Sequence, residues 1–200
     1  MPDFNAISST FSEIYDKNVW GEGSGASGPI ETRPYMEMLA AFLRNNEITS
    51  VVDVGCGDWK FSREMDWTGI RYRGFDVVES VIEANKQKFA SENVSFETLR
   101  ALGNLPKAHL VVCKDVLQHL PIKDVSEHLD YFSANYKYAI VTNDIFPDKF
   151  TNIDIPYGAG RAIRLDLPPF SRKIAVLMRW TIAHLDFRVV KDCCLLLRPK

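Results

Sequence analysis

The stretch VVDVGCGDW, from Val51 to Trp59, constrains the fold of this chain more than any other part of the sequence. Its first residues indicate a short buried strand, which runs directly into Gly55 and Gly57. Glycine has no side chain and tolerates positive φ, so a turn of this kind brings the backbone close to a bound ligand. The stretch therefore predicts a strand, a tight turn and a ligand held at the end of the strand.

Apolar runs alternate with helical patterns over the middle of the chain. Strands are predicted at residues 51–54, 71–75, 94–98, 109–113 and 138–142, with helices at 78–89 and 122–136. This alternation is typical of a parallel sheet that is covered by helices on both faces and connected by right-handed crossovers. A chain of 200 residues with 46% hydrophobic content can bury one such core, so we expect a single α/β domain.

The N-terminal part of the chain adds two helical patterns. Apolar residues from Phe11 to Val19 recur at helical spacing and predict a short amphipathic helix. A second helix is predicted to begin at Pro34, because proline suits a first helical turn, and to end at Asn45 and Asn46.

The pattern changes after the fifth predicted strand. The segment 143–172 is rich in Pro, Gly, Asn and Asp, and we expect it to be a loop at the mouth of a substrate site. Strands over 174–180 and 193–198 are expected to complete the sheet. A helix over 174–184 is the alternative for the first of these.

Charge and hydropathy bear on location and partners. No apolar run approaches the roughly 18 residues of a membrane span, and the N-terminus lacks the pattern of a signal peptide, so we expect a cytoplasmic protein with no membrane partner. The formal net charge of −2 argues against a nucleic-acid partner. The four cysteines lie in or beside apolar runs and are predicted to be reduced structural thiols: Cys56, Cys113, Cys193 and Cys194.

The ligand of the glycine turn can be narrowed by the residues around it. Lys60 occupies the position of the third glycine in the dinucleotide fingerprint, which argues against a pyrophosphate. Asp53 can reach an amino group of the ligand or fix the glycine loop through its amides. Asp76, at the end of the next predicted strand, is placed to accept hydrogen bonds from ribose hydroxyls, although it can also stabilise a helix N-terminus. These residues predict a ligand that has a ribose and no pyrophosphate.

Three motifs together resemble the class I S-adenosylmethionine-dependent methyltransferases. They are VVDVGCGDW (51–59), YRGFDVVESVIEAN (72–85) and LPKAHLVVCKDVLQHLP (105–121), and the resemblance covers residues 35–142. It implies a Rossmann-like, seven-stranded, mostly parallel sheet with helices on both faces in a single domain. Residues 1–33 would then form an N-terminal helical segment and a Gly/Ser-rich lid, and residues 34–200 the methyltransferase domain.

The same resemblance implies roles for individual residues. Asp53, Gly55 and Gly57 would hold the methionine portion of S-adenosylmethionine, Asp76 its ribose and Val77 the adenine face. The family often has an acid after the third strand, and the sequence FETLRALGN leaves Thr98 or a backbone carbonyl for the adenine amine. The residues expected to bind the cofactor are Trp20, Ser24, Asp53, Gly55, Cys56, Gly57, Asp76, Val77, Thr98 and Lys114.

The flanking segments IYDKNVWGEGSGASG and NIDIPYGAGRAIRLDLPPF resemble a subgroup of small class I enzymes, some of which are found near glycan-building enzymes. That resemblance implies O-methylation of a sugar or glycan hydroxyl. The segment Gly21 to Gly28 is then expected to be a mobile lid or an amide nest over the cofactor carboxylate, with a plain linker as the alternative.

Two routes to an activated hydroxyl are open. His119 and Asp115 are the predicted catalytic residues, with His119 as the best candidate for the general base, unless this histidine only packs against the cofactor or the core. The resemblance implies that Asp115 stands beside the reacting centre. Alternatively, Asp115, Asn143 and Asp144 are predicted to hold Mg²⁺, which would bind the acceptor and lower its pKa. His109, at the start of a predicted strand, is expected to be structural.

The C-terminal quarter of the chain suggests acceptor contacts. Residues 151–200 carry nine Lys or Arg against four Asp or Glu, which indicates either a solvated face or a site for an anionic substrate group. Asp144, Tyr157, Arg161 and Arg164 are the predicted substrate-binding residues, through bidentate hydrogen bonds and stacking on a sugar ring. The expected partner is a small molecule or glycan acceptor.

Other functions remain open from the sequence alone. An N- or C-methyltransferase of a small metabolite, or a non-catalytic S-adenosylmethionine-binding module, fits the same motifs. The sequence leaves open the acceptor, the position methylated, metal dependence, the oligomeric state and whether the chain is part of a larger polypeptide.

Overall fold

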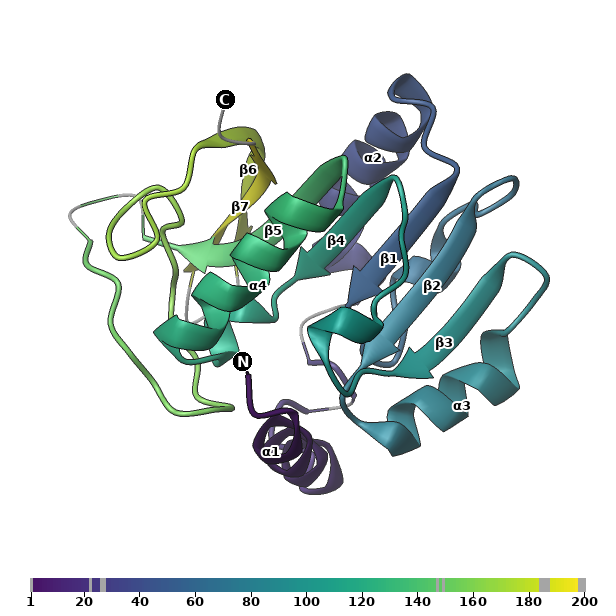
Figure 1. The fold of residues 1–200 in the computed structure, drawn as a ribbon, viewed down its shortest axis with the longest axis horizontal. Helices are drawn as coiled ribbons and strands as arrows, with labels where there is room; N and C mark the ends of the chain where they lie inside the picture. Colours follow the sequence, from purple (N-terminus) through teal and green to yellow (C-terminus); the bar gives the residue numbers. More distant parts are fainter. Residues whose placement is uncertain are drawn as a thin grey trace.

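The computed structural model describes residues 2–21, 23–25, 28–146, 148, 150–183 and 188–197. One seven-stranded sheet runs through the molecule in the order β3-β2-β1-β4-β5-β7-β6 (Figure 1). The strands are β1 (Ser50–Val54), β2 (Arg71–Asp76), β3 (Val94–Thr98), β4 (Leu110–Lys114), β5 (Tyr138–Ile145), β6 (Ile174–Ala183) and β7 (Arg188–Leu196). The first five are parallel, while β7 is antiparallel to both β5 and β6. The predicted seven-stranded, mostly parallel sheet is confirmed.

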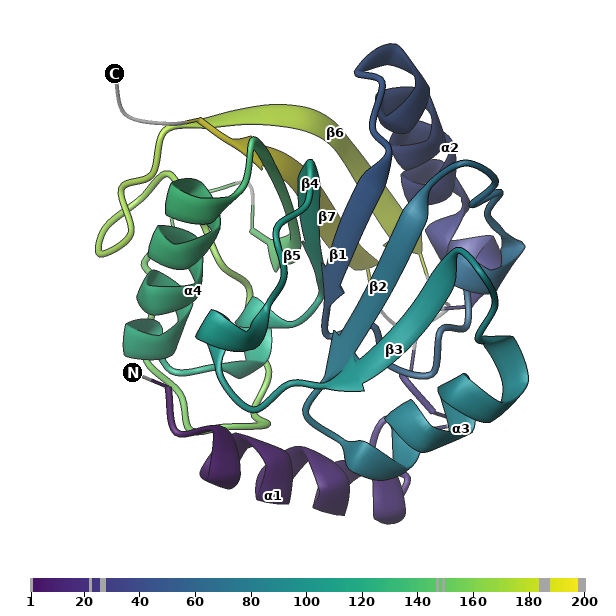
Figure 2. The ribbon, with the colours of Figure 1, turned by 45° about the vertical axis from the view of Figure 1, so that its right-hand side comes forward.

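Helices cover both faces of this sheet, as predicted (Figure 2). The α-helices are α1 (Phe4–Asp16), α2 (Pro29–Asn45), α3 (Glu79–Phe89) and α4 (Ile122–Asn135), and the 3₁₀ helices are η1 (Ser62–Glu64), η2 (Leu102–Asn104) and η3 (Leu117–His119). Successive strand residues point to opposite faces. Val52 and Val54 therefore pack in the core with α4, whereas Val51 packs in the core with α2 and α3. α1 lies beyond the carboxyl ends of the parallel strands.

Both N-terminal helices are longer than the sequence pattern indicated. α1 begins at Phe4 rather than near Phe11, because the side chain of Asp3 accepts hydrogen bonds from two backbone amides of the first turn. α2 begins at Pro29, so the prediction of a start at Pro34 is wrong. Pro34 lies inside the helix, where it removes one backbone hydrogen bond while the apolar face beyond it still packs in the core.

The end of the chain forms two long antiparallel strands. The alternative of a helix over 174–184 is wrong, because β6 spans Ile174–Ala183 and pairs with β7. β7 begins at Arg188, earlier than the predicted start at residue 193. Its neighbouring residues Cys193 and Cys194 are both buried, one in each core cluster, as expected of a strand that is covered on both faces.

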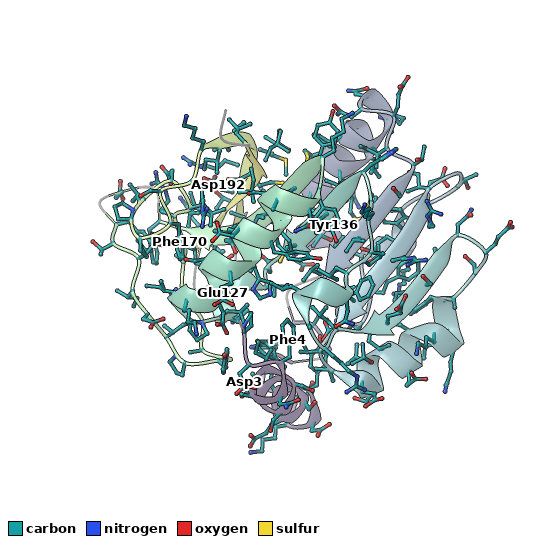
Figure 3. All side chains as sticks on the ribbon, viewed as in Figure 1. Asp3, Phe4, Glu127, Tyr136, Phe170 and Asp192 are labelled. Atoms are coloured by element: carbon teal, nitrogen blue, oxygen red, sulfur yellow. The ribbon has the colours of Figure 1, made fainter. Side chains whose placement is uncertain are left out.

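The segment between β5 and β6 has no helix or strand among its described residues, as the prediction of a loop over 143–172 implied, although β5 extends to Ile145. Asn152 organises this loop: its side chain donates to the carbonyls of Arg164 (2.9 Å) and Pro168 (2.8 Å) and accepts from the amide of Arg164 (3.0 Å). Phe170 of the loop is buried in the core cluster that includes α4 (Figure 3). The loop therefore covers part of a sheet face in place of a helix.

The four cysteines are buried free thiols. No helix in the described part of the chain combines the length and the apolar character that a membrane crossing requires.

Candidate active site

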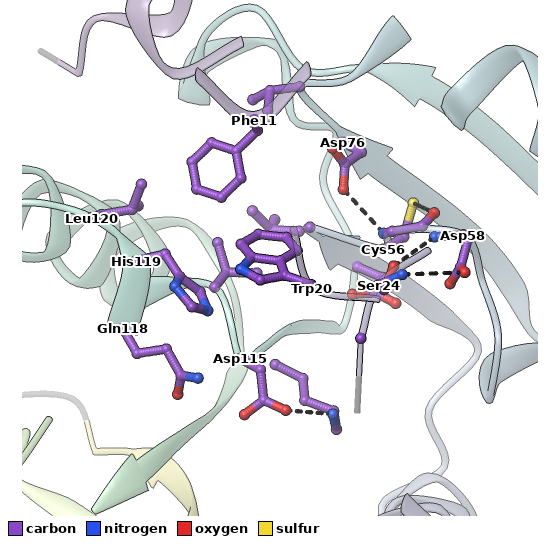
Figure 4. A pocket seen from close by; sticks show the side chains of 18 of the residues that line it. Phe11, Trp20, Ser24, Cys56, Asp58, Asp76, Asp115, Gln118, His119 and Leu120 are labelled. Carbon is purple, nitrogen blue, oxygen red and sulfur yellow. Dashed lines mark hydrogen bonds and ion pairs between the residues drawn. The ribbon is translucent and has the colours of Figure 1, made fainter. Parts of the chain in front are cut away.

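A cavity of about 360 Å³ lies at the carboxyl ends of the central strands, between the sheet and α1 (Figure 4). Open α/β sheets bind their ligands at this end of the strands. Trp20 lies between His119 and Ser24 in the view of Figure 4, while Asp76, Cys56 and Asp58 gather at the other side. The cavity is lined by all but Thr98 of the residues predicted to bind the cofactor.

The glycine turn forms the floor of this cavity. Gly55 and Gly57 have φ of +78° and +54°, and the amide of Gly55 donates to the carbonyl of Phe75 (2.7 Å). A Cβ atom on Gly55 would lie 2.2 Å from a methyl carbon of Val116, and one on Gly57 would lie 2.2 Å from the Ser24 hydroxyl. Both the backbone conformation and the space thus require glycine.

Asp76 holds this turn to the end of β2. Its Oδ2 accepts from the amide of Gly57 (3.0 Å), and its Oδ1 accepts from the amide of Val78 (3.0 Å). Burial raises the pKa of Asp76, and the backbone hydrogen bonds oppose that rise. Each carboxylate oxygen has a second lone-pair direction, so Asp76 can also accept hydrogen bonds from a ligand in the cavity that it lines.

Asp53 is buried behind the turn and lines the same cavity. The hydroxyl of Tyr72 donates to its Oδ2 (2.6 Å). Burial raises the pKa of Asp53 to about 6, although the Tyr72 hydrogen bond and the charge of Lys114 lower it. Sequence reasoning did not identify Tyr72, whose position in a buried strand resembles that of any core aromatic residue.

The N-terminal segment forms the roof of the cavity. Ser8 donates to the carbonyl of Val77 (2.9 Å), and the hydroxyl of Tyr15 bonds to that of Ser24 (2.8 Å). Ser24 also accepts from the amide of Asp58 (3.0 Å), which fastens the predicted lid to the glycine turn. Within that lid, Glu22, Ala26 and Ser27 lie outside the described residues.

Aromatic rings of this roof meet His119. The ring centroids of Trp20 and His119 are 5.0 Å apart, and those of Phe11 and Trp20 are 5.7 Å apart. Sequence reasoning missed Phe11 as a cavity residue, together with Phe4, Ile7 and Tyr15 on the same helix. The apolar spacing predicted that this helix would pack on the domain, but it did not indicate that the helix would pack over the cavity.

His119 has a defined neutral tautomer. It lies in η3, and its Nδ1 is 3.0 Å from the carbonyl oxygen of Ala159. A carbonyl only accepts, so Nδ1 carries the proton and the neutral ring keeps an unprotonated Nε2. Burial lowers the pKa of His119, despite the opposing effects of the Ala159 carbonyl and nearby carboxylates. The neutral ring can therefore accept a proton at Nε2.

Asp115 is held by two ammonium groups. Lys114 Nζ is 2.6 Å from its Oδ2, and Lys191 Nζ is 2.8 Å from its Oδ1. Burial alone would raise the pKa of Asp115, but the two lysines outweigh burial and lower it to about 2. A carboxyl group with such a pKa does not take up a proton near neutral pH, so the geometry does not support the predicted role of Asp115 in base catalysis.

The predicted metal ligands do not form a metal site. Lys191 Nζ is also 2.5 Å from Asp144 Oδ1, so an ammonium lies between the two carboxylates that were expected to bind Mg²⁺. Asn143 is buried in β5 and does not line the cavity. Within the described ranges, no three His, Cys, Asp or Glu side chains are grouped so that they could hold a metal ion. These residues do not fit Mg²⁺, and Lys191 was missed because it is distant in sequence from both carboxylates.

The other predicted substrate residues lie outside the cavity. Tyr157 donates to Asp124 (2.6 Å), and Arg164 forms a bidentate pair with Asp166 (2.8 and 2.6 Å). Arg161 is half-buried, and the structure shows no hydrogen-bond partner for its guanidinium nitrogens.

The two remaining sequence predictions concern residues near strand ends. Thr98 pairs with Asp76 at the end of β3, and it is Leu99 that lines the cavity. His109 is exposed at the opposite end of the sheet, where it contacts Thr49.

Comparison with known proteins agrees with this geometry. Residues 52–133 match the family described as "Methyltransferase domain". No curated protein matches the chain. Among solved structures, magnesium protoporphyrin IX methyltransferase (ChlM) from Synechocystis PCC 6803, with bound SAM, has a TM-score of 0.63 at 17% identity, covering 100% of this chain and 98% of that one.

Two further structures share the fold. The N-methyltransferase NodS from Bradyrhizobium japonicum WM9, in complex with S-adenosyl-L-homocysteine, has a TM-score of 0.60 at 11% identity, covering 85% of this chain and 89% of that one. An O-methyltransferase family protein from Burkholderia thailandensis has a TM-score of 0.56 at 9% identity, covering 84% of this chain and 56% of that one. A methyltransferase domain model thus matches residues 52–133, and the seven-stranded sheet has the fold of these solved methyltransferases.

Proposed function

We propose that this chain transfers the methyl group of S-adenosylmethionine to a hydroxyl group, and that the acceptor is a sugar or glycan. One observation carries the proposal: His119 lines the cavity, and its neutral ring has an unprotonated Nε2. When bound, S-adenosylmethionine supplies a methyl group on a sulfonium, and its transfer to a hydroxyl leaves S-adenosylhomocysteine and one proton. The protein must therefore orient the hydroxyl and accept that proton.

The residues of the cavity fit the cofactor. In this proposal Asp76 binds the ribose hydroxyls and Asp53 binds the positive amino group of the methionine portion, and both carboxylates belong to residues that line the cavity. The glycine turn leaves no room for a Cβ atom, which is the feature expected where the backbone forms a ligand cradle. Val77 and Leu99 provide apolar contacts for the adenine.

The opposite end of the cavity suits a polyhydroxyl acceptor. Gln118 and Asp144 line it, and Gln118 accepts from the amide of Asp144 (2.8 Å). Amide and carboxylate groups bind hydroxyl groups, while the ring of Trp20 offers a surface for the apolar face of a sugar. In this arrangement Asp144 remains a candidate acceptor ligand, whereas Arg161 and Arg164 would act only on parts of an acceptor that extend beyond the cavity.

Release of S-adenosylhomocysteine from the purified protein tests this proposal. The protein is incubated with S-adenosylmethionine and three matched panels of acceptors: glycosides, phenols and amines. We expect turnover with glycosides and no change on addition of EDTA. Turnover with amines alone would contradict O-methylation, and turnover with phenols alone would contradict a carbohydrate acceptor.

Binding of S-adenosylhomocysteine should weaken as the pH falls through about 6. Burial raises the pKa of Asp53 from 3.8 to about 6 in the folded protein. The ligand-free folded protein therefore takes up a proton on Asp53 as the pH falls through about 6. A protonated Asp53 loses its attraction for the ligand's amino group, so binding below this pH must release the proton. Calorimetry in buffers of different ionisation enthalpy measures that release.

The Asp53→Asn variant is the control, because it should bind weakly and without the proton release. Equal proton release in this variant would show that another group titrates. Because the pKa of Asp53 is higher in the folded protein than in the unfolded chain, the free energy of unfolding of the ligand-free protein should fall as the pH rises from about 4 to about 6.

A further inference from the structure

The ammonium of Lys191 lies at the acceptor end of the cavity. In the pairing of β5 with β7, Lys191 is directly opposite Asp144, and its side chain is 7% exposed. Its Nζ contacts Asp144 Oδ1 (2.5 Å) and Asp115 Oδ1 (2.8 Å), which come from the ends of two neighbouring parallel strands. A cation is therefore fixed between the two carboxylates at the edge of the sheet where open α/β folds bind substrates.

An ammonium has three N–H donors. The structure assigns two of those of Lys191 to Asp115 and Asp144, and Lys191 lines the cavity. We infer that Lys191 is a built-in cation that takes the place of a divalent metal and donates its third N–H to the oxygen of the acceptor hydroxyl. This inference rests on the proposed O-methyl transfer.

The two carboxylates keep this cation charged. Burial would lower the pKa of Lys191, but Asp115 and Asp144 outweigh burial and raise it. A positive donor beside the acceptor oxygen stabilises the negative charge that develops as the hydroxyl proton moves to His119. Removing one such preorganised donor from an active site costs about 10²–10³ in turnover.

Lys114 does not fill the same role. Its Nζ bonds to Asp115 Oδ2 (2.6 Å) and lies over the rings of Phe61 and Tyr35, with centroid distances of 5.2 and 5.9 Å. The ammonium of Lys114 therefore contacts Oδ2 of Asp115 and these two rings, whereas Lys191 contacts Oδ1. Lys191, in contrast, connects Asp115 to Asp144, which also bonds to Gln118 beside His119.

A set of variants tests the role of Lys191. Lys191→Met should bind S-adenosylhomocysteine like the wild type while its turnover of a panel glycoside falls by about 10²–10³. Its rate should also keep rising at alkaline pH, because the acceptor hydroxyl no longer has its pKa lowered. Lys173→Met, which removes an exposed lysine from the same part of the chain, is the matched control and should behave like the wild type.

Because Lys191→Met leaves two buried carboxylates with less charge compensation, Lys191→Met/Asp144→Asn provides a charge-balanced second variant. If this double variant binds S-adenosylhomocysteine and turns over at the wild-type rate, Lys191 is only structural and the inference is overturned. Retained binding with a loss of turnover greater than that of Asp144→Asn alone supports it.

Mn²⁺ provides a readout that needs no acceptor. Electron paramagnetic resonance should show no Mn²⁺ bound at this site in the wild type, but binding by Lys191→Ala, in which a cation position is opened between Asp115 and Asp144. Failure of Lys191→Ala to bind Mn²⁺ would contradict the assignment of a cation position. If instead the wild type turns over no hydroxyl acceptor, the proposed function fails, and the Mn²⁺ result still decides whether Lys191 occupies a cation position.

Discussion

Replacement of His119 by alanine should lower the turnover of a hydroxyl acceptor by about 10²–10⁴-fold and leave the affinity for S-adenosylhomocysteine unchanged. The reason is that the neutral ring, oriented by the Ala159 carbonyl and with its pKa lowered by burial, keeps an unprotonated Nε2 on a residue that lines the cavity. Asp115 is already ion-paired with two lysines. The rate of S-adenosylhomocysteine release with saturating cofactor measures the effect.

The dependence of the reaction rate on pH provides a second test of His119 as the base. A histidine base acts in its neutral form, so the rate should rise with pH as His119 loses its proton. Because burial lowers the pKa of His119, this rise should lie below pH 6.5, and it should be missing in the variant. His109→Ala is the matched control, since His109 is exposed at the opposite end of the sheet. An unchanged rate in His119→Ala would assign this histidine to packing against Trp20.

Asp76→Ala should weaken binding of S-adenosylhomocysteine by about 10²-fold or more, since each hydrogen bond to a charged group contributes about 1.5–3 kcal/mol and two are expected with the ribose. The substitution also frees the amides of Gly57 and Val78, which Asp76 now holds. Asp76→Asn should be nearly as weak, because its NH₂ group would face one of these amide donors. Calorimetry with S-adenosylhomocysteine measures both.

Glu79→Ala separates ribose binding from a helix-dipole effect. Glu79 is an exposed acid in the first turn of α3 and pairs with Arg100, outside the cavity. If charge at the helix N-terminus were the important contribution of Asp76, both variants would lose stability to a similar extent and neither would lose affinity specifically. We expect a loss of affinity in Asp76→Ala alone.

Local sequence signals predicted most of the residues at the end of the cavity that contains the glycine turn. The glycine turn, Asp53 and Asp76 lie within or next to strands, and their spacing alone indicates that they meet at one edge of a parallel sheet. The structure brings all of them to one cavity. The departures were at helix ends, where Asp3 and Pro29 supply start signals that the apolar periodicity of Phe11 and its neighbours does not contain.

The sequence by itself determined the α/β class, the five parallel strands and the glycine turn, because these depend on periodicity and on short-range turn chemistry. Only the tertiary structure decided what occupies the space between Asp115 and Asp144. Lys191 arrives there because β7 returns antiparallel to β5 and aligns with Asp144, a pairing in register between segments distant along the chain. Likewise, Arg161 and Arg164 lie in the loop after β5, in which Asn152 bonds to the backbone of Arg164, and neither arginine lines the cavity.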